Sequence, residues 1–223
     1  MFMNSFLGIL SVFLFSFSVS AEQSFNCTHK LEAQGDLLGL VDSSYKNIST
    51  IRADFHQTSY FAGLDRSESS SGSLEMKRPG MMNWSYAEPH KQSFVADGDS
   101  LWFYQPEDNQ VTIGRFQQSF SSELPVSFLI GIGKLSESFD LANVCGTEKG
   151  IKLDLKSKKP DPSMQGFSLL VDKSNYTPLG ANITDVGGNQ TSIILADLKF
   201  NSEIQDESFN FKIPRGVDII DRR

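Results

Sequence analysis

The chain has 223 residues, with 27 acidic and 20 basic side chains and a formal net charge of −7. An acidic surface repels a phosphate backbone, so this composition argues against a nucleic-acid partner. The length suits one domain that can bury a sizeable core. We therefore expect a single domain over residues 22–223.

The first 21 residues differ from the rest because they contain no charged side chain. Their apolar run ends in the small-residue stretch Ser18-Val19-Ser20-Ala21 and is short for a membrane span. We interpret residues 1–21 as a secretory signal peptide. Because no Lys or Arg precedes the apolar run, an uncleaved N-terminal anchor is the alternative.

Two cysteines, Cys27 and Cys145, follow this segment. A secreted chain enters an oxidising compartment, where a cysteine pair forms a disulfide more often than two free thiols. We therefore predict a Cys27–Cys145 disulfide.

Hydrophobic periodicity predicts one helix followed by many short strands. Between Gly35 and Lys46 the apolar residues recur at steps of three and four, which is typical of an amphipathic helix. From Ile51 the period becomes two, which indicates a half-buried strand. Further strand-like runs cover residues 72–78, 82–86, 93–96, 101–104 and 110–116. A turn at Asp97-Gly98 predicts a hairpin, because glycine tolerates the positive φ that such turns require.

The alternation stops over residues 117–143, where we expect one or two short apolar helices. Strand signals return at residues 151–156, 166–171, 180–185, 191–200 and 208–213, with a hairpin turn at Gly187-Gly188-Asn189. A sheet of this many strands curls, and it must be covered on one face or closed upon itself. An apolar concave face beneath a few helices makes a cavity suited to acyl chains or similar ligands.

Arg78 is unusual because it is in phase with the apolar residues Leu74 and Met76 on the predicted strand 72–78. A guanidinium placed against apolar surface costs free energy unless its donors are satisfied. We therefore expect Arg78 to have a partner or a function. The alternative is an exposed cation at a strand end, because Pro79 interrupts the strand beside it.

Five motifs follow one another at close spacing: Lys77-Arg78-Pro79-Gly80, Asn83-Trp84-Ser85-Tyr86, Glu88-Pro89, Asp97-Gly98 and Leu101-Trp102-Phe103-Tyr104. Together with residues 51–57 and 209–218, this series resembles the LolA family of periplasmic outer-membrane lipoprotein carriers. The resemblance implies a mainly β fold with helices, an incomplete antiparallel β-barrel of about ten or eleven strands with a helical lid over a hydrophobic cavity.

The resemblance also implies a function. Family members act in the periplasm as chaperones that shield the acyl chains of lipoproteins. They move this cargo from an inner-membrane ABC transporter to an outer-membrane acceptor, LolB, and we expect this chain to do so as a monomer without a cofactor. Arg78 matches the family arginine that holds the lid closed through hydrogen bonds to lid backbone carbonyls.

Alternation places two groups of candidate residues around the expected cavity, although it does not assign which strand face is the inner one. The cavity candidates are Leu74, Met76, Met82, Trp84, Tyr86, Leu101 and Phe103. The lid candidates are Phe120, Leu124, Phe128 and Leu129. For each of them, ordinary core packing is the alternative.

The sequence gives little support to an enzyme. It contains neither a G-x-S-x-G elbow nor an H-E-x-x-H pair, and its histidines, His29, His56 and His90, lack ligand spacing, so we expect no metal site. Two other functions stay open: a related envelope sensor or regulator, and a carrier of another lipid or glycolipid. We prefer the shuttle to the sensor, because the closing segment ends close to Arg223 and leaves no room for a further domain.

Overall fold

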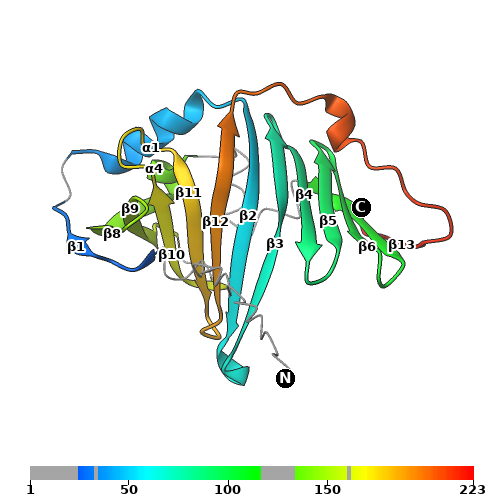
Figure 1. Ribbon diagram of the computed structural model, residues 1–223, viewed down its shortest axis with the longest axis horizontal. Coiled ribbons are helices and arrows are strands. Elements are labelled where there is room, and N and C mark those ends of the chain that lie inside the picture. Colours follow the sequence, from blue (N-terminus) through cyan, green and yellow to red (C-terminus); the bar gives the residue numbers. More distant parts are fainter. Residues whose placement is uncertain (1–24, 33–34, 117–133, 160–161) are drawn as a thin grey trace, which may run out of the picture.

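Thirteen strands form one continuous sheet in the computed structural model, which describes residues 25–32, 35–116, 134–159 and 162–223 (Figure 1). The order across the sheet is β1-β8-β9-β10-β11-β12-β2-β3-β4-β5-β6-β7-β13. The strands are β1 His29–Lys30, β2 Thr50–Phe61, β3 Arg66–Lys77, β4 Met81–Glu88, β5 Gln92–Asp97, β6 Ser100–Gln105, β7 Gln110–Arg115, β8 Phe139–Gly146, β9 Ile151–Ser157, β10 Met164–Val171, β11 Pro178–Asp185, β12 Gln190–Phe200 and β13 Asp218–Asp221. Neighbouring strands are antiparallel except β13, which pairs with β7 in parallel.

Four short helical segments accompany the sheet in the described residues: α1 Leu37–Lys46, η2 Ala62–Leu64, α4 Leu135–Ser138 and η3 Asp206–Phe209. Helix α1 begins where the Asp36 carboxylate accepts a hydrogen bond of 2.8 Å from the backbone N–H of Gly39. Its apolar side buries Leu37, Leu38, Val41 and Tyr45. The helix predicted between Gly35 and Lys46 is therefore present.

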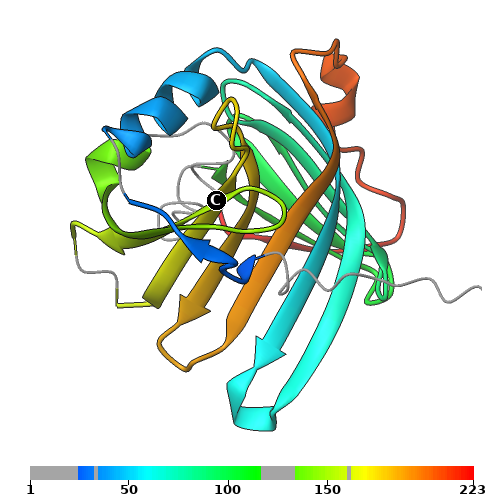
Figure 2. The same ribbon diagram turned by 60° about the vertical axis from the view of Figure 1, so that its left-hand side comes forward.

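The sheet is strongly curved but open (Figure 2). Its two edges are β1 and β13, which do not pair with each other. Helices α1 and α4 lie together at one end of the curve. We call the strand face that carries Phe55 and Trp84 the inner face, and the opposite one the outer face.

One apolar cluster extends along the inner face from β8 to β6 and includes the buried side of α1. The strand register puts these apolar side chains on the same face of the sheet. Phe55 lies opposite Leu195 on β12, and Leu74 lies opposite Trp84 on β4. The fully buried members include Phe55, Val41 and Leu169. The core of the protein therefore lies on the inner side of the sheet.

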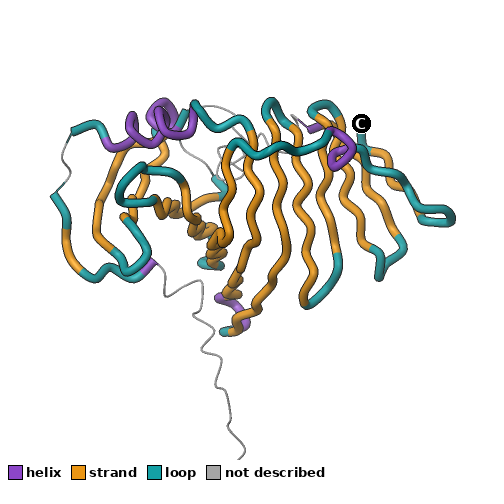
Figure 3. The backbone as a smooth tube through the Cα atoms, turned by 45° about the horizontal axis from the view of Figure 1, so that its top comes forward, coloured by secondary structure: helices purple, strands orange, loops and turns teal. Residues whose placement is uncertain are grey.

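The outer face of the later strands is covered by the C-terminal segment (Figure 3). The chain leaves β12, runs along the strand ends and forms η3 beside β4 and β5. The Asn83 side chain donates a hydrogen bond of 3.0 Å to the Ser208 carbonyl, and Phe209 is buried. Phe211 packs on Trp102 and Tyr104, with ring centres 6.2 and 5.6 Å apart.

At the other edge of the sheet, the predicted disulfide is present. Cys27 and Cys145 are bonded, with their Cα atoms 5.6 Å apart. The bond ties the segment before β1 to β8, and Lys30 of β1 lies opposite Cys145. Phe25 nearby packs on Leu170 and Ile194 of the outer face.

The expected strand number of ten or eleven is too low, because β1, β8 and β13 were not expected. Residues 139–143 were read as part of a helical stretch, yet they begin β8, where a register shift between Leu141 and Asn143 breaks the alternation that would have revealed a strand. The expected strand over residues 208–213 is also wrong. Phe209 and Phe211 belong to a segment that pairs with no strand, and they pack against the outer face of the sheet. Their alternation with polar residues therefore reflects burial and not strand pairing.

Candidate functional site

The seven cavity candidates lie on the inner face. Leu74, Met76, Met82, Trp84 and Leu101 are buried, and Tyr86 and Phe103 are half-buried. The register explains their common orientation, because Met76 lies opposite Met82 and Leu74 opposite Trp84. The structure therefore brings all seven to the same side of the sheet. Their contact with a ligand stays a prediction.

An aromatic group occupies the centre of this face. The ring of Phe55 lies 5.2 Å from Trp84 and 4.9 Å from Tyr86, measured between ring centres. Phe94 and Phe103 stack at 4.3 Å on the adjacent strands β5 and β6. Offset and edge-to-face rings of this kind give a large apolar surface that is shaped by the strand register.

The inner face changes from apolar to polar along β2. Ile51, Ala53 and Phe55 are buried, and the next two inward residues are Gln57 and Ser59. The strand opposite changes in the same way: Leu74 faces Ala53, whereas Ser70 faces Gln57. The apolar half lies toward the end of the sheet that carries α1. The polar half lies toward the β2–β3 connection.

The polar half is internally hydrogen-bonded. The Tyr86 hydroxyl donates a bond of 2.9 Å to Gln57 Oε1, and Gln57 Nε2 donates one of 3.1 Å to Ser59 Oγ. These bonds satisfy polar groups that would otherwise lose water on burial. The border between the two halves runs past Phe55, Trp84 and Tyr86.

Arg78 lies at the rim, directly after the last residue of β3, and not within the strand as expected. Its guanidinium carbon lies 4.5 Å from the centre of the Tyr45 ring on α1, and its backbone N–H donates a bond of 2.9 Å to the Ser49 carbonyl. Cations are attracted to aromatic faces at this distance. The arginine therefore joins the rim of the sheet to the covering helix.

Tyr45 is suited to this contact because it stays neutral. Burial raises the pKa of its hydroxyl well above the usual range, and the nearby charge and hydrogen bond of Arg78 offset this only in part. The neutral ring presents its negative face to the guanidinium. Tyr45 belonged to the predicted helical stripe, but periodicity gave no sign that it would meet Arg78.

A second contact fixes α4 to α1. The Asp42 carboxylate accepts hydrogen bonds from the backbone N–H groups of Leu135 at 2.7 Å and Ser136 at 3.1 Å. A carboxylate at this place satisfies helix N–H groups that have no partner within the helix. The first residues of α4 are thereby held against α1. The lid candidates Phe120, Leu124, Phe128 and Leu129 fall in residues 117–133, outside the described residues.

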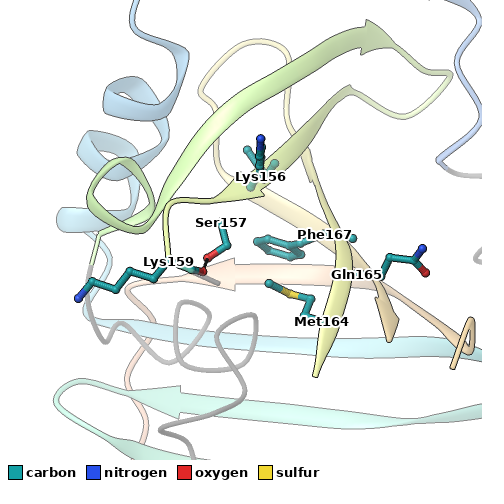
Figure 4. A pocket seen from close by; sticks show the side chains of 8 residues that line it. Lys156, Ser157, Lys159, Met164, Gln165 and Phe167 are labelled. Carbon is teal, nitrogen blue, oxygen red and sulfur yellow. Dashed lines mark hydrogen bonds between the residues drawn. The ribbon is translucent and has the colours of Figure 1, made fainter. Parts of the chain in front are cut away.

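A pocket of about 290 Å³ opens on the inner face between β9 and β10 (Figure 4). Its apolar lining comes from Leu155, Phe167 and Met164, and its rim includes Lys156 and Lys159. Leu155 and Phe167 are buried members of the main apolar cluster. The pocket therefore borders the apolar cluster on the β9–β10 side of the sheet.

A second depression, of about 420 Å³, is lined by residues of β2, β3 and β4, among them Gly72. Its lining combines Phe55 and Tyr86 with polar side chains such as Asp54 and Ser73. The absence of a side chain at Gly72 matters, because a Cβ there would lie 1.9 Å from the Ser85 carbonyl oxygen. Glycine at this position lets β3 and β4 approach closely beneath Tyr86.

Two further observations concern the described residues only. None of their helices has the length and hydropathy of a membrane span. No group of three or more His, Cys, Asp or Glu side chains among them is arranged to hold a metal ion.

The family model and two similar curated proteins that match this chain carry the same description. A family model described as "Outer membrane lipoprotein carrier protein LolA" matches residues 46–212. The outer-membrane lipoprotein carrier protein of Halorhodospira halophila is 32% identical over 192 residues, which cover 84% of this chain and 86% of that protein. The carrier protein of the same name from Hahella chejuensis is 31% identical over 177 residues, or 78% of this chain and 83% of that protein.

A solved structure shares the fold. The crystal structure of an uncharacterized conserved protein from Thermus thermophilus matches with a TM-score of 0.54 and 11% identity. The match covers 83% of this chain and 97% of that one.

Proposed function

The chain belongs to the LolA family of outer membrane lipoprotein carrier proteins, and we propose that its inner face shields the acyl chains of lipoproteins while they cross the periplasm. The observation that carries this proposal is the continuous apolar cluster on one face of an open sheet, with α1 placed over its rim. No covalent bond is made or broken in this function. The protein binds its cargo, protects it from water and releases it.

The physical need for such a carrier is large. Each methylene group of an acyl chain that leaves an apolar environment for water costs about 0.8 kcal/mol. A triacylated anchor therefore does not cross an aqueous space unaided. An open sheet with Leu, Met, Phe and Trp side chains on its inner face offers the apolar surface that the acyl chains require.

The role implies partners at both membranes. An inner-membrane ABC transporter loads the carrier and supplies the energy, and an outer-membrane acceptor, LolB or its equivalent, receives the cargo. The carrier acts as a monomer between them. Cargo then passes from the carrier to the acceptor because the acceptor binds it more tightly.

Arg78 serves as the latch of this carrier. A cation over the Tyr45 ring holds α1 against the rim, and entering acyl chains compete with that arrangement. A contact of modest strength suits this task, because a stronger one would keep cargo out and a weaker one would leave the apolar face exposed. Leu74, Met76 and Met82 are buried in the apolar cluster of the inner face, and acyl chains would bind against this cluster once α1 is released.

The proposal is tested by isolating the protein with its cargo. The chain is expressed in the periplasm of its host or of a related bacterium, captured without detergent, and the bound molecules are identified by mass spectrometry. We expect acylated N-terminal peptides of lipoproteins in near-stoichiometric amount. Recovery of free phospholipid, pigment or glycolipid in their place would contradict the proposal.

A matched pair of variants locates the binding face. Phe103→Glu places a charge on the inner face at a half-buried position, so it should strongly reduce the recovered lipoprotein. Ser69→Glu places the same charge on an exposed outer-face position of β3 and should leave recovery unchanged. Thermal unfolding of both variants checks that each is folded.

A further inference from the structure

The indole nitrogen of Trp84 is a buried hydrogen-bond donor without an acceptor. Trp84 is 4% exposed, and its Nε1 has no hydrogen-bond partner among the residues that the structure describes. A buried donor left unpaired costs about 1–3 kcal/mol, so few are kept in folded proteins and each requires an explanation. Packing alone does not supply one, because Phe would fill the centre of an apolar face without this cost.

Three described side chains next to the indole offer it no acceptor. Leu74 lies directly opposite on β3 and Phe94 directly opposite on β5, and Phe55 is 5.2 Å away between ring centres. None of these side chains contains an oxygen or nitrogen atom. The nearest polar group on the same strand and face is the Tyr86 hydroxyl, which donates to Gln57.

Trp84 also occupies a particular level of the inner face. Toward α1 the inward residues of β2 and β3 are Ile51, Ala53 and Met76, and toward the β2–β3 connection they are Gln57 and Ser70. Trp84 lies level with Leu74 and Ala53, and the next inward level, that of Phe55 and Tyr86, borders the polar residues Gln57 and Ser70. Tryptophan takes the same level at membrane surfaces, with its ring among acyl chains and its N–H near carbonyl groups.

We propose that Trp84 Nε1–H binds an acyl carbonyl oxygen of the cargo lipid and thereby sets the depth and direction of the cargo. This inference rests on the proposed carrier function. The acyl tails point toward Ile51 and Met76, and the glyceryl and peptide end lies toward Gln57 and Ser59. Two carbonyl types fit this chemistry: the glyceryl esters and the amide of an N-acylated lipoprotein. Trp84 is thus a specificity-determining residue that distinguishes acylated lipids from plain hydrocarbon.

Three synthetic lipopeptides test the carbonyl requirement. The first carries a diacylglyceryl group and a free N-terminus, the second replaces both esters by ethers, and the third adds an N-acyl amide to the diether. Binding is measured for the wild type and for Trp84→Phe. We expect the variant to bind the diester about five-fold more weakly, as for one lost hydrogen bond, and to bind the simple diether as the wild type does.

The third lipopeptide identifies the acceptor. A five-fold loss with the N-acylated diether adds the amide as a partner of Trp84, and no loss with it assigns the bond to the esters. An equal loss with all three probes would show that Trp84 acts by packing only, and no loss with any acylated probe would also overturn the inference. If the wild type binds none of the probes, the carrier function itself fails.

A spectroscopic readout does not depend on the substitution. The chain has only two tryptophans, Trp84 and Trp102, so an ¹⁵N-labelled sample gives two indole N–H resonances. Loading with the diester should move the Trp84 resonance downfield and slow its exchange with solvent, while the resonance of Trp102, on the outer face, should not shift.

Benzothienylalanine at position 84 keeps the two-ring shape without the N–H and should reproduce the five-fold loss of affinity for the diester. An unmoved Trp84 resonance on loading would contradict the hydrogen bond.

Discussion

The guanidinium carbon of Arg78 lies 4.5 Å from the centre of the Tyr45 ring, so a residue at the rim of the sheet and a residue of the covering helix form a cation–π pair. Arg78 follows the last residue of β3, and Tyr45 lies in the last turn of α1. The pair therefore connects the sheet to a helix that takes no part in the strand ladder.

Replacing Arg78 by Leu should loosen α1 and leave the sheet intact. The lost pair is worth about 1 kcal/mol, so the free energy of unfolding should fall by about that amount. Amide exchange measured by mass spectrometry should become faster in α1 but not in β2. Lipoprotein should still load and then fail to pass to the acceptor in a transfer assay.

The matched control for this prediction is Arg78→Lys, which keeps a cation that can lie over the Tyr45 ring and should retain more of the transfer than Arg78→Leu. Transfer at the wild-type rate by Arg78→Leu would remove the latch role.

The close approach of β3 and β4 predicts a strong effect at Gly72. A Cβ at this position would lie 1.9 Å from the Ser85 carbonyl oxygen and 2.8 Å from Cε1 of Phe55, so Gly72→Ala must displace backbone. We expect a loss of about 2–3 kcal/mol in the free energy of unfolding, measured in urea. Gly63→Ala is the control, because its Cβ would meet nothing within 4 Å. Equal stability of the two variants would show that the strands separate easily at Gly72.

The disulfide should contribute strongly to stability. It closes a loop with a sequence separation of 118 residues, for which the chain-entropy account gives about 4–5 kcal/mol. The double variant Cys27→Ser with Cys145→Ser should unfold at a correspondingly lower urea concentration. Wild type treated with a reducing agent should match it. A reduced wild type that unfolds like the oxidised one would show that β1 is held by its other contacts.

Asp154 predicts an acid-dependent part of the stability. Burial raises the pKa of its carboxyl, but hydrogen bonds from Ser168 at 2.7 Å and Asn143 at 3.2 Å, together with Lys152, outweigh burial and hold the pKa below its usual range. A carboxyl with a lowered pKa stabilises the fold above about pH 4, and the contribution is lost as the pH falls through the folded-state pKa. Asp154→Asn should therefore cost about 1 kcal/mol at pH 7.

The cost of Asp154→Asn should shrink in urea titrations below about pH 4. A difference between variant and wild type that stays constant from neutral pH into acid would exclude the charge as its cause.

Much of the sheet could be predicted because its strands alternate regularly. Ile51, Ala53 and Phe55 alternate with exposed residues, and the hairpin at Asp97-Gly98 follows from the positive φ of Gly98. Strand β13 could not be predicted in this way. All four of its residues are exposed, and its parallel pairing with β7 depends on contacts far along the chain.

The candidate site was predictable in part. The alternation of residues along the predicted strand drew attention to Arg78. The same alternation placed Met82, Trp84 and Tyr86 on one face of the next strand, as the structure has them. The partner of Arg78 was not predictable, because the position of Tyr45 depends on how α1 packs against the rim. The unpaired indole of Trp84 was equally hidden, since hydrogen bonding depends on the neighbours that folding brings together.

The opposite ends of the chain supply the outermost strands of the sheet, and only β1 is covalently fastened to its neighbour. A closed barrel has a diameter fixed by its strand number and stagger, whereas an unclosed one has no such constraint. The curvature of this open sheet is therefore not fixed by closure, and small changes of twist alter it without rupture of any ladder. One sequence can in this way accommodate fatty anchors that differ in length and number.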